Sequence, residues 1–387
     1  MKSVIAVLAV MVGIGSVSGA DLELYGYFEP EFSGATVNDQ FLQLNSNKLR
    51  VDLSSSLSDQ ISFTGNVNIL NYNGRTEWSL LEFVPERLSE PHRQLAPEAF
   101  AYRYEDDAEL DNAYVRMYGR GFTITFGRQQ IASGSGYVWN PTDPFNDPVV
   151  LDPTYEVPGV NGVRLDADFV TNMTLTLFYS PEESWERSRK LLRWTARLPR
   201  FDLSLSAAQR PLTISDFSTL ESMETRQDMF GVDINADLFG VGCWSENAYN
   251  KIDNGADYWS NVLGVDYTFE SGWYWVAEYY HDESGKKSSC AYTFTDWIRY
   301  LTGETRTVSQ DQVYTYTSYP FTDLLSGGGT VVYSISDGSV LLIPTLEYSV
   351  SDDLTLTFFG NAFTGKEGTM YSTDMGSGGL IRLRAYF

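Results

Sequence analysis

The chain has 387 residues, of which 43% are hydrophobic, and it carries 27 lysines and arginines against 51 aspartates and glutamates. The formal charge of -24 repels phosphate backbones and no run of basic residues offsets it, so nucleic acid is excluded as a partner. Two cysteines and two histidines exclude a disulfide scaffold and a four-thiolate zinc site, and we expect no metal and no cofactor.

Residues 1–20 have the features of a secretory signal peptide. Lys2 precedes an apolar run from Val4 to Ile14, and Ser18-Gly19-Ala20 supplies small residues before a cleavage point. The alternative, a membrane anchor, needs about 20 apolar residues without interruption by glycine. No later apolar run approaches that length. Residues 21–387 are therefore expected to form one domain that is either secreted or inserted into a membrane as a β-barrel.

Apolar and polar residues alternate with a period of two along many segments. This pattern covers 48–54 and 61–69, which are joined by a tight turn, and it returns over 163–169, 173–179, 192–198 and 201–207. A membrane barrel requires such strands, because one face of each strand meets lipid and the other meets a polar interior. The pattern predicts an all-β fold, a transmembrane antiparallel β-barrel.

Short and long connections between these strands alternate, as they do in outer-membrane barrels. The short turns are expected at 54–60, 119–121, 170–172, 199–200, 239–240, 270–272 and 351–353. The long loops are expected at 33–46, 71–109, 129–157, 180–189, 211–227, 250–257, 281–339 and 364–377. Seven turns and eight loops connect about 16 strands; Val331 to Ser336 has strand-like content, so 18 strands are an alternative. A soluble β-sandwich or jelly roll and a repeat solenoid are the other folds considered.

The last strand, from Leu380 to Phe387, supports a membrane barrel. Ile381, Leu383, Ala385 and Phe387 share one face, and Arg382, Arg384 and Tyr386 share the other. A terminal strand that ends in Phe resembles the C-terminal signature of bacterial outer-membrane proteins. That resemblance implies that the barrel insertion machinery reads Phe387 and that the protein is located in the bacterial outer membrane, with lipid and lipopolysaccharide around it.

A barrel of 16 strands encloses an aqueous channel, so its function depends on the side chains that line it. The residues expected to line the pore are Lys48, Arg50, Arg116, Arg128, Arg164, Arg193, Arg197, Arg382 and Arg384. Acidic residues fall on the same inward faces, among them Asp166, Asp233 and Glu278. The basic groups either tune the passage of solutes or only satisfy these acids within a polar lumen.

The loop near 131–157 is the best candidate for a constriction. Glycines allow a close approach of its backbone, prolines stiffen its return, and aromatic residues provide anchors. The residues expected to form the constriction are Gly134, Gly136, Trp139, Asn140, Asp143 and Phe145. We expect this loop to fold inward and to narrow the pore.

This block resembles a motif of porin-like outer-membrane barrels, including relatives of alginate-export channels. The resemblance lies in Gly127-Arg128-Gln129 followed by Asn140-Pro141-Thr142-Asp143, although Ser133 stands where an aromatic residue would be expected. It covers the signal peptide, about 35 residues from Asp111 and the final strand. The resemblance implies a channel for passive diffusion of small hydrophilic solutes, for which a homotrimer is one possible assembly.

Two other functions are retained as alternatives. One is an outer-membrane barrel enzyme, a lipase or protease, in which Asp282 and Glu283 stand beside His281. Both His281 and His92 are expected in loops. We predict that the protein is not an enzyme. The other is a structural or assembly barrel plugged by its own loops. Cys243 and Cys290 could pair in an oxidising compartment.

Overall fold

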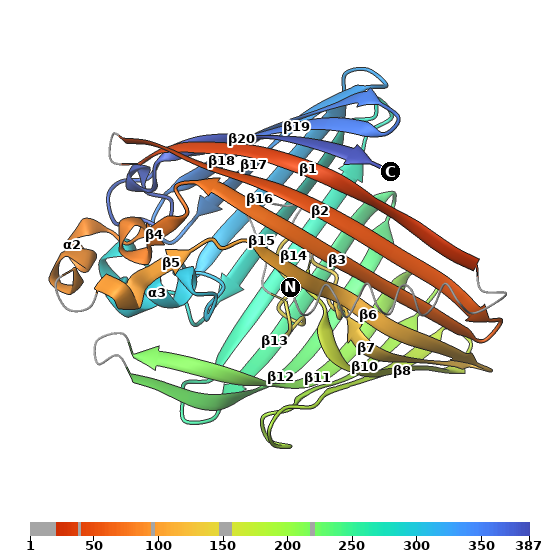
Figure 1. Cartoon of the computed structure of the whole chain (residues 1–387). Coiled ribbons are helices and arrows are strands. Elements are labelled where there is room, and N and C mark those ends of the chain that lie inside the picture. The colour runs from red at the N-terminus through yellow and green to blue at the C-terminus, as the bar shows by residue number, and fades with distance from the viewer. Residues whose placement is uncertain (1–20, 38–39, 94–96, 147–156, 217–220) are drawn as a thin grey trace.

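The structure is a computed structural model that describes residues 21–37, 40–93, 97–146, 157–216 and 221–387. Eighteen strands form one closed antiparallel barrel, because β1 pairs with β2 on one side and with β20 on the other (Figure 1). The predicted signal peptide, residues 1–20, lies outside the described residues, as do residues 147–156 of the predicted constriction loop. The all-β barrel is confirmed, with the alternative count of 18 strands.

The barrel strands have the following bounds: β1 Asp21–Val37, β2 Gln40–Ser58, β3 Ile61–Gly74, β6 Asp107–Gly119, β7 Phe122–Gln129, β8 Val160–Val170, β9 Met173–Ser180, β10 Arg189–Arg197, β11 Phe201–Asp216, β12 Glu221–Leu238, β13 Val241–Ile252, β14 Tyr258–Thr268, β15 Tyr274–Asp282, β16 Asp311–Pro320, β17 Leu325–Ser334, β18 Val340–Ser351, β19 Leu354–Phe363 and β20 Ser377–Tyr386.

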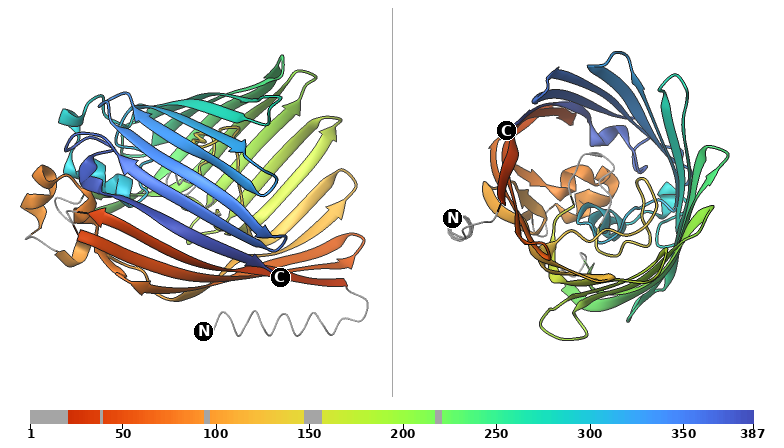
Figure 2. Two further views of the ribbon diagram at one scale, coloured as in Figure 1. Left: turned by 90° about the horizontal axis from the view of Figure 1, so that it is seen from above. Right: turned by 90° about the vertical axis from the view of Figure 1, so that its right-hand side faces the viewer.

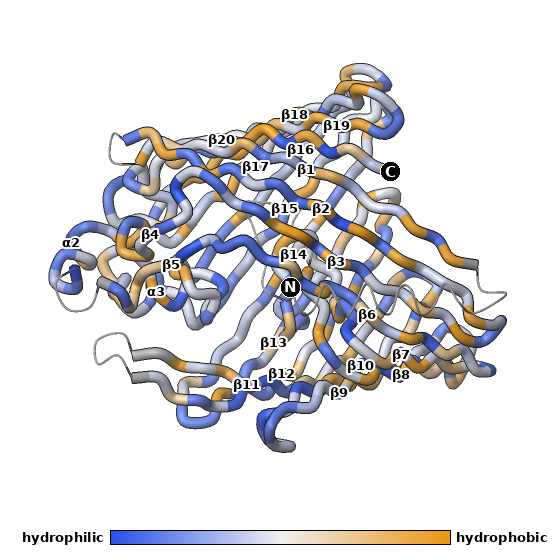
Figure 3. The backbone as a smooth tube through the Cα atoms, viewed as in Figure 1, coloured by the Kyte–Doolittle hydropathy of each residue, from blue (hydrophilic) through white to orange (hydrophobic). Residues whose placement is uncertain are grey.

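Alternating side chains give the barrel an apolar outside and a polar inside. Along β1, Phe28 and Phe32 are exposed on the outer surface, whereas Glu29 is buried on the inner face. Hydrophilic and hydrophobic residues alternate along the strands in the same way around the barrel (Figure 3). This arrangement suits a hydrocarbon solvent outside and a polar lumen inside.

The count of 18 arises from a hairpin inside the predicted loop 281–339. β16 and β17 pair from Gln312↔Ser334 to Pro320↔Ser326, so the loop after β15 is confined to 283–310. The prediction of one long loop there is wrong, because three consecutive glycines, Gly327 to Gly329, interrupt the alternation that would reveal β17.

Two other predicted loops are strands. The ladder between β1 and β2 continues to Val37↔Gln40, so the predicted loop 33–46 is a hairpin with long arms. Likewise β11 and β12 pair as far as Asp216↔Glu221 within the predicted loop 211–227. Both predictions are wrong because small and polar residues are typical of loops, but a strand that extends beyond the membrane requires no apolar face.

The loops at the long-loop end of the barrel carry short helices and a two-stranded sheet, seen beside the labels α2 and α3 in Figure 1. We define the cap as the described residues of 75–106, 283–310 and 364–376. Its elements are β4 Glu77–Ser79, η1 Leu80–Phe83, α2 Glu86–Ser89, η2 Glu90–His92, η3 Pro97–Phe100, β5 Ala101–Arg103, η4 Ser289–Ala291, α3 Phe294–Leu301 and η5 Thr373–Met375.

Helix α3 anchors the cap. The Thr293 side chain and Asp296 form a reciprocal capping box at its start, and Phe294, Trp297 and Ile298 are buried at helical spacing. These side chains belong to one apolar cluster that includes Val84 and other cap residues as well as inward residues of β14 to β19. The cap is therefore packed onto the barrel mouth.

The structure shows the surroundings of the two cysteines and the two histidines. Cys243 and Cys290 are both free. His281 lies in β15, so its predicted loop position is wrong; its Nδ1 lies 2.7 Å from Asp311 Oδ1. His92, in the cap, stacks on Phe294 with ring centroids 3.7 Å apart.

Candidate functional site

The connection between β7 and β8 enters the lumen rather than leaving the barrel. We call residues 130–159 the inward loop; the structure describes 130–146 and 157–159 of it. Seen from the short-turn end, this yellow segment lies inside the ring of strands (Figure 2). Its hydrogen bonds reach β12, β13 and β15, which lie five to eight strands further around the barrel than β7. The described part of the loop therefore lies inside the barrel and is bonded to the wall formed by these strands.

Glu246 of β13 is the first anchor of the inward loop. It has no exposed surface and accepts hydrogen bonds from the main-chain N–H groups of Ser135, Gly136 (2.5 Å) and Thr142 (3.1 Å) and from the Thr142 hydroxyl (2.9 Å). A buried carboxylate is tolerated only when donors compensate for its lost hydration. Here the loop supplies all four donors, so loop and wall satisfy each other.

Glu278 of β15 is the second anchor. Its carboxylate accepts hydrogen bonds from the N–H groups of Tyr137, Val138 (2.8 Å) and Trp139 (3.3 Å), and from the indole of Trp244 (2.7 Å). Trp139 is buried and stacks on Tyr280 of β15, with ring centroids 5.0 Å apart. The tip of the loop is thereby held by both charge and packing.

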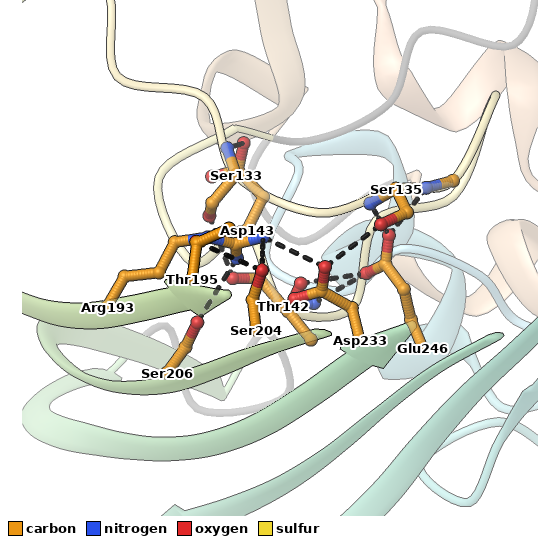
Figure 4. Close-up of polar contacts among 11 residues, drawn as sticks. Ser133, Ser135, Thr142, Asp143, Arg193, Thr195, Ser204, Ser206, Asp233 and Glu246 are labelled. Carbon is orange, nitrogen blue, oxygen red and sulfur yellow. Dashed lines mark hydrogen bonds and ion pairs between the residues drawn. The ribbon is translucent and has the colours of Figure 1, made fainter. Parts of the chain in front are cut away.

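Asp143 stabilises the loop from within. It accepts hydrogen bonds from the N–H groups of Ser133 (3.0 Å) and Phe145 (3.0 Å) and from the Asn146 side chain (2.7 Å). Burial raises the pKa of the Asp143 carboxyl, while these hydrogen bonds and the charge of Arg306 act in the opposite direction. Asp143 thus closes the predicted Asn-Pro-Thr-Asp turn onto Ser133 (Figure 4).

Gly134 is required where the loop turns toward Glu246. Its φ is +100°, a region that other residues rarely adopt. A Cβ atom on Gly134 would also lie 2.7 Å from Glu246 Oε1. A residue without a side chain therefore allows the backbone to approach Glu246 this closely.

Two arginines bind the main-chain carbonyls of the loop. Arg306, in the loop after β15, donates to the carbonyls of Asn140 (2.5 Å), Asp143 (2.5 Å) and Asn146 (3.2 Å). Arg210 of β11 donates to the Pro144 carbonyl at 3.0 Å. Carboxylates therefore hold the N–H groups of the loop, and guanidinium groups hold its C=O groups.

Apolar side chains fill the space between the loop and the wall formed by β9 to β13. The buried cluster contains Ile131 of the loop together with Phe178, Leu191, Ala208, Met229 and Ala248 of the wall, and Phe145 packs against it. Phe145 meets Phe178 edge to face at 5.6 Å. The loop therefore lies against one wall, and the polar lumen is on its other side.

Most of the basic residues expected in the pore occupy the polar, inward rows of their strands. These are Lys48 and Arg50 of β2, Arg116 of β6, Arg164 of β8, Arg193 and Arg197 of β10, and Arg382 and Arg384 of β20. Arg128 differs, because it shares the row of the exposed Phe126 in β7. Its Nε donates to the Asp111 carbonyl at 3.1 Å and so braces the root of the inward loop.

The inward arginines are extensively paired with acids. Arg382 lies 2.7 Å from Glu31, Arg384 contacts Glu29, and Arg50 lies 2.9 Å from Asp52. Two more such pairs are Arg164 with Asp166 at 2.8 Å, and Arg193 with Asp233 at 2.9 Å. Arg193 also donates to Ser204 and Ser206, and Asp233 accepts from Ser135 of the loop, so this pair supports the loop (Figure 4).

Sequence reasoning missed the roles of Glu246 and Arg306. Glu246 could have been noticed, because it is an acid on the inward row of β13 between Trp244 and Ala248, where a buried carboxylate needs donors. Arg306 gave no signal, because it lies in a loop and reaches residues about 160 positions away in the sequence.

A cavity of about 510 Å³ lies on the long-loop side of the inward loop. Pro141 and Pro144 form part of its lining, and Arg210, Lys286, Asp282 and Glu283 contribute charges of both signs. Its lining includes Arg306 as well, so a solute in this cavity would contact the inward loop.

In the described residues, no helix is long and apolar enough to cross a membrane, and no group of three or more His, Cys, Asp or Glu side chains is arranged to hold a metal ion. The side chain of His281 pairs with the carboxylate of Asp311.

Comparison with solved structures identifies the fold. OccAB1 of Acinetobacter baumannii is similar with a TM-score of 0.58 at 9% identity, over 96% of this chain and 97% of that chain. OccD3 (OpdP) of Pseudomonas aeruginosa is similar with a TM-score of 0.52 at 11% identity, over 96% of this chain and 91% of that chain. No protein-family model and no curated relative matches the sequence. The fold is a porin-like β-barrel of the bacterial outer-membrane type, and at this level the predicted location is confirmed.

Proposed function

We propose that the protein is an outer-membrane channel through which small hydrophilic solutes diffuse passively, beside the inward loop. The observation that carries this proposal is the inward loop itself, which lies inside the barrel and is bonded to one wall through Glu246 and Glu278. A loop packed against a wall narrows a barrel without sealing it. The polar inner rows on its free side supply the wetted surface that such a channel needs.

Further features belong to the same proposal. Residues 1–20 would direct export and be removed, Phe387 would be read by the insertion machinery, and lipid and lipopolysaccharide would surround the apolar band. In the structure Phe387 exchanges main-chain hydrogen bonds of 3.1 Å with Gly26, so the C-terminus completes the closure of the barrel. A homotrimer and a relationship to alginate-export channels remain predictions.

Swelling of proteoliposomes in sugars of increasing size tests the proposal. Liposomes that contain the folded protein should swell quickly in a pentose and progressively more slowly in di- and trisaccharides, because the inward loop limits the width. Equal rates for all sugars would contradict a constriction, and no swelling in any sugar would contradict the channel.

We predict that the open pore prefers cations. The inward arginines are largely neutralised by acids such as Glu29, Glu31 and Asp52, whereas inward acids on β14 to β19 face no arginine of those strands. A unit charge 4 Å from an ion in water contributes about 1 kcal/mol, which is about a fivefold preference. The zero-current potential across a KCl gradient should therefore have the sign set by K⁺.

The paired variant Glu29→Gln and Glu31→Gln provides the control for this prediction. Removing the two acids frees the charges of Arg382 and Arg384, and the zero-current potential should move toward that of an anion-selective pore. A wild-type pore that already prefers Cl⁻, or a potential that does not change in the variant, would refute the neutralisation argument.

The packed cap favours a second candidate, a barrel plugged by its own loops with a structural or assembly role. Trp297 and Ile298 have no exposed surface although they belong to a loop at the barrel mouth. Deleting residues 131–156 separates the two functions. A porin should conduct before the deletion and more widely after it. A barrel plugged by the inward loop should conduct only after the deletion, and a barrel plugged by the cap should not conduct in either state.

A further inference from the structure

Three tyrosine rings meet at the tip of the inward loop. Tyr137 of the loop lies 6.5 Å from Tyr274 of β15 and 6.3 Å from Tyr316 of β16, measured between ring centroids, and Tyr274 lies 6.4 Å from Tyr316. Tyr314 supports Tyr137 from behind at 5.9 Å and is itself buried. The three rings thus form a triangle at the tip of the inward loop.

This triangle is accessible and acidic. The side chain of Tyr137 is 45% exposed, although the main-chain N–H groups around it are bound to Glu278. Asp266 of β14 stands beside the rings and accepts a hydrogen bond from the Tyr274 hydroxyl at 3.1 Å. None of the ion pairs of the described residues includes Asp266, so its charge is available to a solute.

The surrounding wall is free of basic residues. Strands β14 to β19 contain no lysine or arginine, while they carry Asp266, Glu278, Asp282, Asp311 and Glu347. Every arginine of the barrel strands lies in β2, β6 to β8, β10 to β12 or β20. A cation that approaches the rings therefore meets attraction from Asp266 and no repulsion from its own wall.

We propose that Tyr137, Tyr274, Tyr316 and Asp266 form a subsite for solutes that carry an ammonium group, in particular a quaternary ammonium. Aromatic faces attract such cations through the ring quadrupole, and a nearby carboxylate adds charge attraction without requiring hydrogen bonds from the ligand. The inference deepens the proposed function, because solutes reach these rings through the same lumen.

Calorimetric titration of the folded protein in detergent tests the subsite with choline and its neutral isostere, 3,3-dimethylbutanol. Choline should bind at least about fivefold more tightly than the isostere, since the two differ by one charge. Glucose is the third probe, because tyrosine faces also suit sugars. Equal binding of choline and the isostere, or tighter binding of glucose, would overturn the inference.

Single substitutions assign the site. Asp266→Asn keeps the shape of the site, and it should weaken choline binding about fivefold while leaving the isostere unchanged. Tyr137→Leu keeps an apolar side chain but removes the ring, and it should weaken choline binding about two- to fivefold. Glu347→Gln, which removes an inward acid outside the triangle, is the matched control. Unchanged choline binding in Asp266→Asn would refute the assignment.

The titration does not depend on conduction, so the two proposals can fail separately. If the protein conducts ions in plain KCl but distinguishes neither choline from its isostere nor wild type from Asp266→Asn, only the subsite is lost. If it binds choline as expected but gives no conductance, the subsite stands and the channel is lost.

Discussion

Replacing both Glu246 and Glu278 by alanine is expected to release the inward loop from the barrel wall. The two carboxylates accept hydrogen bonds from six main-chain N–H groups of the loop. Each buried donor left without a partner costs about 1–3 kcal/mol, so the loop cannot keep this conformation. Single-channel recordings should show a larger and noisier conductance, because the released segment moves within the lumen.

Proteolysis gives an independent readout of the same change. No lysine or arginine lies between Arg128 and Arg164, so trypsin cannot cut the loop, whereas chymotrypsin can cut at Tyr137, Trp139 or Phe145. The folded wild type should resist chymotrypsin there, and the double variant should be cleaved. Glu347→Ala is the control, since it removes an inward acid that does not contact the loop. If the double variant resists chymotrypsin as well as the wild type does, and its single-channel current is no larger and no noisier, the carboxylates do not hold the loop.

Trp297→Ala is expected to loosen the cap. The Trp297 ring has no exposed surface and lies between Val84 of the first cap segment and Met375 of the third, with Tyr292 and Tyr300 beside it. Truncating a buried tryptophan costs about 3–5 kcal/mol. Because the barrel strands are bonded independently of the cap, we expect local opening of the cap rather than loss of the barrel.

Trypsin digestion measures this opening, because the cap contains Arg87, Arg103 and Lys287. Cap cleavage should become rapid in Trp297→Ala while the barrel remains intact and resistant to heat in detergent. Trp185→Ala removes a tryptophan that is 65% exposed and should behave like the wild type. Equal resistance of Trp297→Ala and Trp185→Ala would contradict a cap held by its apolar core.

The strands that cross the membrane could be predicted, because lipid requires an apolar residue at every second position. The prediction failed for segments that do not need an apolar residue at every second position. In β1, Ser33 and Gly34 extend the ladder beyond the membrane without an outer apolar row, and in β17 Gly327 and Gly329 replace the larger side chains of that row. Their partners across the ladder stabilise them as strands, and those partners cannot be read from a local window.

The candidate site was predictable as a segment but not as a set of contacts. The glycines and the turn ending at Asp143 indicated an inward loop, and the alternation placed Arg382 and Arg384 inside. The contacts of Glu246 and Arg306 could not be predicted, because they join residues more than 100 positions apart. The cap core was also hidden, because its apolar residues come from three separate loops.

Single-channel recording in a planar lipid bilayer tests the central claim most directly. Addition of the folded, heat-resistant wild-type protein should raise the current in uniform steps, each step being the insertion of a barrel whose lumen is open beside the inward loop. Folded protein that inserts into the bilayer but produces no steps, and that begins to conduct only after residues 131–156 are deleted, would contradict the account.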